Sequence, residues 1–206
     1  AIEDEYFFSH PGIAVPDLAR AVWNNVQYFY CEITTEKCHF NLQGGSTITQ
    51  QLVKNTLLSP ERTWQRKLKE AILAIQIESK LSKSEILEKY LNQVSYGGTA
   101  YGVEAAARMY FSKSAAELNL AEASLLAGLP AAPSLYSPFG AFPERAKQRQ
   151  LQVLQRMLAE GFISDKEFND ASKFTLTYAE PDTQILAPHF VMYVRNQLEN
   201  QISPDL

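Results

Sequence analysis

Helix start signals, each followed by apolar residues at helical spacing, recur along the chain and constrain its fold more than any other feature. Thr47-x-x-Gln50 and Ser82-x-x-Glu85 are capping boxes, whose side chains satisfy the free amides of a first helical turn. Pro143 before and Gly161 after a further periodic stretch mark the two ends of another helix. These signals predict a mainly α fold, with helices at about 47–57, 64–80, from Ser82 to before Gly97, 101–111, 119–128, 144–160, 165–173 and 188–200.

Two stretches lack this helical pattern. Residues 28–40 crowd aromatic and β-branched side chains among few helix formers, which predicts a short hairpin or a mobile aromatic loop. Residues 175–178 alternate in the manner of a strand, and Glu180-Pro181-Asp182 is typical of a linker. We therefore predict one domain over residues 1–179, followed by a linker region over 180–206.

Composition excludes several classes of protein. A chain of 206 residues can bury one large core, and its net charge of -4 argues against a nucleic-acid binder, which needs a broad basic surface. Prolines interrupt the longest uncharged stretch, residues 123–143, so we expect no transmembrane helix there. Cys31 and Cys38 are too few for a disulfide scaffold, and either two free thiols or one hairpin disulfide fits the sequence.

The first candidate cluster is the acidic and aromatic run from Glu3 to Gly12. A carboxylate beside apolar rings and other negative charges titrates closer to neutral pH, which suits a general acid or base. A solvated acidic terminus is the alternative interpretation of the same residues.

The second and third candidate clusters are suited to an anion. Gly44-Gly45 leads into the helix that carries Gln51 and Lys54 on one face, and free amides at its start would favour a phosphate. From Lys54 to Glu70 the chain holds five basic and two acidic residues, a local charge of +3. An N-capped surface helix followed by a helix with exposed ion pairs is the structural alternative.

Taken together, the clusters resemble the peptidoglycan glycosyltransferases of class A penicillin-binding proteins and monofunctional transglycosylases. The family's ordered motifs are matched by Glu3-Asp4-x-x-Phe7-x-x-His10-x-Gly12, by Gly44 to Asn55, by Arg66-Lys67-x-x-Glu70, by Lys83 to Asn92 and by Leu126 to Pro138. The chain departs from the family at Ser95, where an aromatic residue is common, and in the longer insert at residues 28–40. The resemblance covers residues 1 to about 160 and implies a lysozyme-like fold with a large helical lobe and a smaller membrane-facing lobe.

The resemblance also assigns roles. Glu3 would be the catalytic base, and Glu70 the second catalytic glutamate, which orients the cations or the acceptor. Asp4, Phe7 and His10 would position the loop around Glu3. The pyrophosphate of the substrate would be bound by Ser46, Thr47, Gln51, Lys54, Asn55, Arg66 and Lys67.

The implied reaction is polymerisation of lipid II by inverting transfer from a polyprenyl-pyrophosphate donor to the 4-hydroxyl of the acceptor. No cofactor would be required, although a Mg²⁺ or Mn²⁺ ion near the pyrophosphate is compatible with the sequence. The implied partners are lipid II, the growing lipid-linked glycan, the membrane surface and other cell-wall synthesis proteins. The site of action would be the extracytoplasmic, periplasmic side of the bacterial cytoplasmic membrane, with the anchor outside these residues. Residues 26–40 and Leu57-Leu58 are the candidate membrane contacts, and packing of these residues inside the domain is the alternative.

Two rival functions remain at this point. A lysozyme-like muramidase or lytic transglycosylase would also use a glutamate beside a sugar cleft, but it has no pyrophosphate to neutralise. The basic residues Lys54, Arg66 and Lys67 therefore favour synthesis. A non-catalytic scaffold that binds lipid II is the second rival, and the intact Glu3 and Glu70 argue against it.

The closing segment 187–195 resembles a linker towards a transpeptidase domain, and the chain contains no Ser-x-x-Lys motif for that activity.

Overall fold

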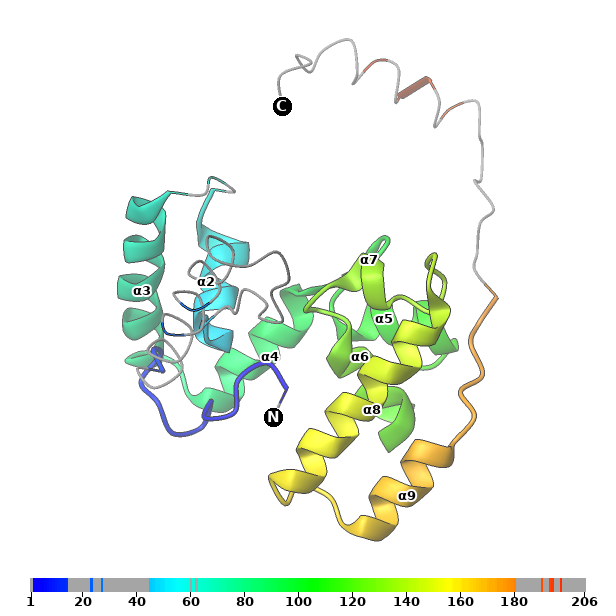
Figure 1. Ribbon diagram of the computed structural model, residues 1–206. Coiled ribbons are helices and arrows are strands. Elements are labelled where there is room, and N and C mark those ends of the chain that lie inside the picture. The colour runs from blue at the N-terminus through cyan, green and yellow to red at the C-terminus, as the bar shows by residue number, and fades with distance from the viewer. Residues whose placement is uncertain are drawn as a thin grey trace.

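The described helices form two groups joined by a central helix. The computed structural model describes residues 2–14, 23, 27, 45–59, 61, 63–180, 190, 193, 194 and 197. In Figure 1, α2 (Ile48–Leu57) and α3 (Trp64–Glu78) lie on one side, and α4 (Lys83–Gln93) runs from them towards the second group. That group contains α5 (Val103–Phe111), α6 (Leu120–Gly128), α7 (Pro133–Tyr136), α8 (Pro143–Ala159) and α9 (Asp165–Lys173), together with the 3-10 turn η1 (Ala115–Glu117).

Local capping explains why these helices begin where the sequence predicts. Thr47, Ser82 and Ser164 each accept a hydrogen bond from the third helical amide, and a Gln or Glu at that position bonds back to the cap. Asn119 caps α6 in the same way. The predicted starts of these helices are therefore confirmed to within about two residues, and so are their ends except that of α4, which ends at Gln93 and not just before Gly97. The mainly α class is confirmed. The likeness to lysozyme stays a prediction.

The differences from the sequence prediction occur where the chain turns. Residue 101, expected at the start of a helix, belongs to the strand β2 (Ala100–Tyr101), which pairs antiparallel with β1 (Ser95–Gly97). Strand β1 begins within the stretch that was expected to stay helical until Gly97. The alternating segment 175–178 is extended without a strand partner, because its apolar side chains pack on the helices instead of pairing along the backbone. The prediction of a strand there is wrong, and the short elements η1 and α7 were not predicted.

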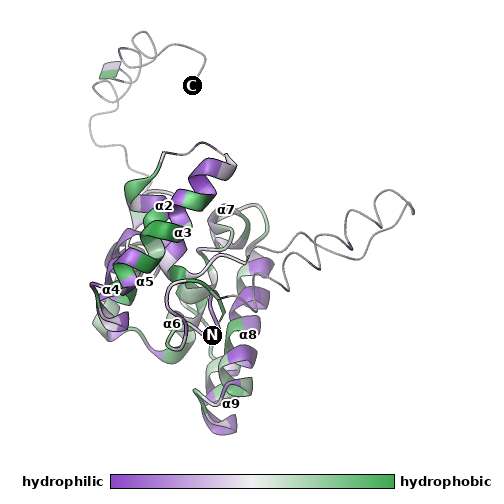
Figure 2. Cartoon of the chain, turned by 90° about the vertical axis from the view of Figure 1, so that its left-hand side faces the viewer, coloured by the Kyte–Doolittle hydropathy of each residue, from purple (hydrophilic) through white to green (hydrophobic). Residues whose placement is uncertain are grey.

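The hydrophobic core joins the two groups of helices. Ile48 and Leu52 of α2, Ile86 and Tyr90 of α4 and Leu125 of α6 belong to one buried cluster. Full burial of an aliphatic side chain stabilises a fold by roughly 1.5–3 kcal/mol, so this shared cluster fixes the groups against each other. Helix α8 contributes one apolar face to the core, and Figure 2 shows hydrophobic and hydrophilic residues mixed along it.

The segment that follows α9, residues 174–180, folds back onto α5. The Tyr178 ring stacks on Phe111 with a centroid distance of 5.9 Å, and the Ala179 amide donates to the Tyr110 carbonyl at 2.8 Å. A domain end near residue 180 stays a prediction.

Of the helix expected at 188–200, the structure describes residues 190, 193, 194 and 197, all helical. Apart from residue 27, the membrane contacts expected at 26–40 lie outside the described residues, as do the hairpin or loop at 28–40 and both cysteines. None of the described helices is both long and apolar enough to cross a membrane.

Candidate active site

The loop that carries Glu3 is fixed by a buried carboxylate and histidine. The Asp4 carboxylate accepts from His10 Nε2 at 3.0 Å and from the Ile48 amide, at the start of α2, at 3.0 Å. The Gly12 amide donates to His10 Nδ1 at 3.1 Å, so the other ring nitrogen, Nε2, carries the proton that Asp4 accepts. Asp4 and His10 are both buried, and this geometry fits the predicted positioning role.

The far end of the same loop is held by α2, α3 and α4. The Thr47 hydroxyl donates to the Gly12 carbonyl at 2.7 Å, and Lys83 Nζ donates to the His10 carbonyl at 2.6 Å while pairing with Glu78 at 2.7 Å. The same ammonium group lies 4.6 Å from the centre of the buried Phe7 ring. Gly12 has φ 93°, and a Cβ there would lie 3.0 Å from the Ala74 carbonyl oxygen, so glycine is required at this turn.

Glu3 itself is held from two sides. Its Oε2 accepts from Gln51 Nε2 of α2 at 3.4 Å, and its Oε1 lies 3.5 Å from Arg149 NH2 of α8. Tyr90 of α4 donates to Gln51 Oε1 at 3.5 Å, which orients the amide. Burial and then the nearby charge of Glu3 raise the pKa of Tyr90, so its hydroxyl keeps the proton that it donates. The Glu3 side chain is 18% exposed.

The acidic neighbours predicted around Glu3 are directed elsewhere. Asp4 contacts His10 and α2, as described above, and Glu5 pairs with Arg156 of α8 at 3.1 Å. The charged group beside Glu3 is instead the cation Arg149. Each neighbouring carboxylate therefore has a basic partner of its own among the described residues, His10 for Asp4 and Arg156 for Glu5.

Two of the amides at the start of α2 are bonded within the protein. Asp4 accepts from the Ile48 amide, and the Thr47 hydroxyl accepts from the Gln50 amide at 3.2 Å. Thr47 is 2% exposed, and its hydroxyl donates to the Gly12 carbonyl. The anion at this helix start is the protein's own Asp4 carboxylate. The predicted contact of Thr47 with a pyrophosphate stays a prediction.

The third motif forms a compact cluster of charges on α3. Glu70 is 1% exposed, accepts from Arg66 NH1 at 3.4 Å and pairs with Lys67 Nζ. Lys67 Nζ also donates to the Ser46 hydroxyl oxygen at 2.7 Å, which joins α3 to the segment before α2. Arg66 Nε is buried and has no hydrogen-bond partner among the described residues. The predicted shared face of Arg66, Lys67 and Glu70 is confirmed, and Ser46 contacts it through Lys67.

The remaining predicted residues lie one turn along α2. Lys54 and Asn55 are exposed, three and four positions after Gln51, and therefore share a helix face with it. Whether they contact a pyrophosphate stays a prediction. The sequence analysis assigned no role to Tyr90 or Arg149, although Tyr90 belongs to the fourth motif. No local pattern marks Arg149 as a partner of Glu3.

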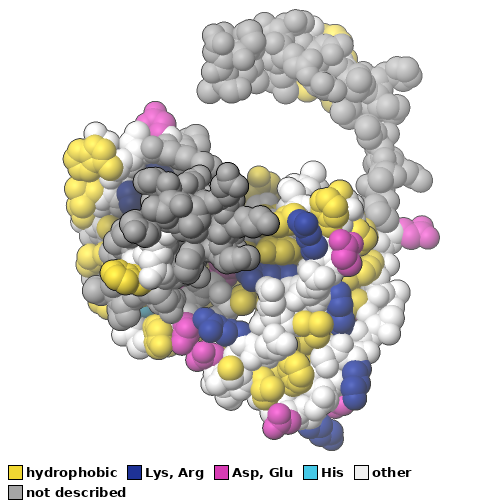
Figure 3. All heavy atoms as spheres, viewed as in Figure 1, with side chains coloured by type: hydrophobic (Ala, Val, Ile, Leu, Met, Phe, Trp, Pro, Cys, Tyr) yellow, Lys and Arg dark blue, Asp and Glu magenta, His cyan; other side chains and the backbone are white. Residues whose placement is uncertain are grey.

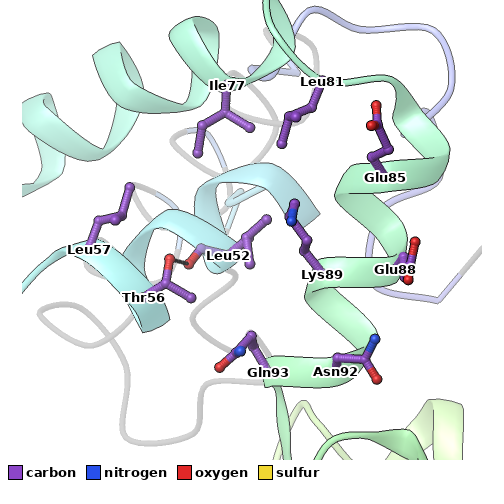
Figure 4. Close-up of a pocket in the computed structure, with 10 residues that line it drawn as sticks. All are labelled: Leu52, Thr56, Leu57, Ile77, Leu81, Glu85, Glu88, Lys89, Asn92 and Gln93. Atoms are coloured by element: carbon purple, nitrogen blue, oxygen red, sulfur yellow. Dashed lines mark hydrogen bonds between the residues drawn. The ribbon is translucent and has the colours of Figure 1, made fainter.

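A separate groove lies on another face of α2. It has a volume of about 610 Å³ between α2, α3 and α4, and Figure 4 shows Leu52, Ile77 and Leu81 directed into it from three segments. Glu85, Glu88 and Lys89 line its α4 side, and none of the predicted site residues lines it. Across the part of the chain that the structure describes, no group of three or more His, Cys, Asp or Glu side chains could hold a metal ion.

Comparison with known proteins gives a consistent set of similarities. The family described as Transglycosylase matches residues 1–158. Penicillin-binding protein 1A of Aquifex aeolicus is 45% identical over 201 residues, which are 98% of this chain and 26% of that protein. Penicillin-binding protein 1A of Escherichia coli is 42% identical over 203 residues, 98% of this chain and 23% of that protein. Penicillin-binding protein 2D of Bacillus subtilis is 40% identical over 205 residues, which are 98% of this chain and 28% of that protein.

The chain thus spans about a quarter of the length of these relatives. The crystal structure of penicillin-binding protein 1A from Haemophilus influenzae is similar at 30% identity and a TM-score of 0.49, over 82% of this chain and 22% of that one. The family match covers more than half of the chain, and the sequence relatives cover nearly all of it. The chain therefore belongs to the transglycosylase family, the glycosyltransferase domain of class A penicillin-binding proteins.

Proposed function

We propose that this domain polymerises lipid II into glycan strands, with Glu3 as the general base. The observation that carries the proposal is the pairing of a held, partly exposed carboxylate with a separate group of cations on α2 and α3. A glycosyl transfer from a lipid pyrophosphate needs both a base for the attacking hydroxyl and positive charge for the leaving group.

In the proposed reaction, the acceptor's 4-hydroxyl oxygen attacks the anomeric carbon of the donor. The new C–O bond forms as the bond from that carbon to the pyrophosphate oxygen breaks, which inverts the anomeric centre from α to β. The hydroxyl proton passes to the Glu3 carboxylate, and the lipid pyrophosphate leaves with the bonding electrons. Gln51 and Arg149 hold Glu3 at 3.4 and 3.5 Å, distances that catalytic contacts in an unliganded site often shorten when substrate binds.

Charge developing on the pyrophosphate would be stabilised by Lys67, Arg66 and Lys54, assisted by Ser46, Gln51 and Asn55. Glu70 accepts from Arg66 and Lys67, which supports an orienting role for this buried carboxylate rather than proton transfer. The unpartnered Arg66 Nε leaves donor capacity beyond Glu70. The divalent cation that the sequence allowed stays a prediction, and activity measured across a Mg²⁺ titration after chelation tests it.

We propose that the α3 side of the domain rests on the membrane that holds the lipid substrate. Trp64, Leu68, Ile72 and Ile75 recur at helical spacing along α3 and are 49–72% exposed, and Leu57 at the end of α2 is 58% exposed. Figure 3 shows hydrophobic side chains gathered at the edge of the molecule where α3 lies. Leu57 was among the membrane contacts expected from the sequence. A lipid surface explains an apolar stripe next to a site for a lipid-linked substrate.

We place this activity at the extracytoplasmic face of the cytoplasmic membrane, with lipid II, the growing lipid-linked glycan and other wall-synthesis proteins as partners. The decisive experiment incubates the domain with labelled lipid II in detergent, with and without a phosphoglycolipid inhibitor, and separates the products by size. We expect inhibitor-sensitive polymer. Release of fragments from preformed glycan, without polymer, would identify the hydrolytic rival, and binding without turnover would identify a scaffold.

A further inference from the structure

Arg149 is the one described cation beside Glu3, and it comes from the opposite group of helices to Gln51. Its NH2 lies 3.5 Å from Glu3 Oε1, while Gln51 Nε2 donates to Glu3 Oε2. Each carboxylate oxygen of Glu3 therefore has its own partner, Oε1 on α8 and Oε2 on α2. In Figure 1 the described start of the chain begins between these two groups of helices and then runs along the α2–α3 side.

The Arg149 side chain is also held by residues other than Glu3. Its Nε donates to the Gly128 carbonyl of α6 at 3.2 Å, its NH1 donates to Gln152 Oε1 at 3.2 Å, and its guanidinium lies 5.2 Å from the centre of the Tyr136 ring. The side chain is 14% exposed. A planar guanidinium held at two nitrogens and by a ring presents its remaining nitrogen in one direction. NH2 is the nitrogen that faces Glu3.

Close contact with Gly128 sets the path of the Arg149 stem. A Cβ at Gly128 would lie 2.8 Å from Arg149 Cγ, closer than side-chain carbons approach each other. Because Cγ is near the backbone, the arginine could not avoid that methyl group by moving its end alone. The absence of a side chain at residue 128 is therefore a condition for the observed placement of Arg149.

We propose that Arg149 is a positioning residue for the catalytic base: it anchors one oxygen of Glu3 to the α6–α8 part of the fold and so aims the carboxylate at the acceptor hydroxyl. This inference rests on the proposed role of Glu3. Displacement of a catalytic group by about 1 Å can lower a rate by about 10²-fold, which sets the size of the expected effect.

The chain supplies a matched control on the same helix. Arg156 lies two turns after Arg149 on α8 and makes the same kind of contact with the same loop, pairing with Glu5 at 3.1 Å. If Arg149 acted only by tethering the loop to α8, then loss of either arginine would have a similar effect. If it acts on the Glu3 carboxylate, only the Arg149 variant changes turnover.

The experiment measures kcat and KM for lipid II and the melting temperature of Arg149→Met, Arg149→Lys, Arg156→Met and Gly128→Ala, beside Glu3→Gln. We expect Arg149→Met to lower kcat by about 10²-fold with KM and melting temperature little changed. Arg149→Lys should recover at least about tenfold of that loss, because lysine restores the positive charge but lacks the planar guanidinium of arginine. Arg156→Met should match the wild type.

Gly128→Ala keeps the charge but shifts the Arg149 stem, so its kcat should fall by about tenfold, and it tests the inference even if Arg149→Met does not fold. Wild-type kcat in both Arg149→Met and Gly128→Ala, or an equal loss in Arg156→Met, would overturn the inference while an inactive Glu3→Gln upholds the proposed base. An active Glu3→Gln would overturn both.

Discussion

Glu3 and Glu70 carry the same carboxylate group in very different surroundings. Glu70 is 1% exposed and accepts from two cations of its own helix, whereas Glu3 is 18% exposed and is held at 3.4 and 3.5 Å by side chains of α2 and α8. The charge of Glu70 is used to fix Arg66 and Lys67. The contacts of Glu3 are longer and come from two different helices. The two carboxylates are therefore held in different ways, Glu70 within one helix and Glu3 between helices.

The largest effect should follow from Glu3→Gln. The amide keeps the size of the side chain but cannot take the proton of the attacking hydroxyl, so polymerisation of lipid II should fall by roughly 10³-fold or more. The contacts of Glu3 are long and partly exposed, so stability should change by less than about 1 kcal/mol. Turnover near the wild-type rate in a gel assay of glycan products would remove Glu3 from the mechanism.

Glu70→Gln should combine a smaller loss of activity with a loss of stability. Removing a buried charge that pairs with two cations should lower the free energy of unfolding by about 1.5–3 kcal/mol, as for other charged hydrogen bonds. Activity should fall by about 10²-fold, because Arg66 and Lys67 lose their fixed positions. Denaturant unfolding and the polymerisation assay measure the two effects. A variant as stable as the wild type yet as inactive as Glu3→Gln would break the contrast between the two glutamates.

Lys54→Ala should weaken binding without changing the fold. Lys54 is exposed, so its loss should leave the melting temperature unchanged while the affinity for a phosphoglycolipid inhibitor falls about tenfold, near 1.4 kcal/mol. Lys89→Ala removes the same charge from the exposed surface of α4, beside the separate groove, and should bind the inhibitor normally. Equal affinity for wild type and Lys54→Ala in a fluorescence titration would remove Lys54 from the pyrophosphate site.

The smallest effect should come from the apolar surface of α3. Leu68→Glu combined with Ile72→Glu should lower the rate several-fold with lipid II in vesicles and leave it unchanged in detergent, because only the vesicle assay requires docking on a bilayer. Phe162→Glu, which alters a side chain 58% exposed beside α9, is the control and should behave as wild type in both assays. An equal loss in detergent would indicate a folding defect rather than a membrane contact.

Much of the fold could be predicted because its signals are local. A capping box spans four residues, so Thr47, Ser82 and Ser164 mark helix starts that do not depend on the rest of the chain. The pairing of Arg66 and Lys67 with Glu70 follows from helical spacing alone. The β1–β2 hairpin was missed because two very short strands leave too little alternation to detect.

The sequence by itself determined the helices, the family motifs and the identity of the charged residues, since each of these depends on residues close together in the chain. Only the tertiary structure decided which partner each charge meets: Asp4 occupies the amide that a phosphate was expected to take, and Arg149 lies beside Glu3 where acidic neighbours were expected. The physical reason is that contacts between distant segments depend on how α2, α4 and α8 pack around one core, and that packing leaves no periodic pattern in the sequence.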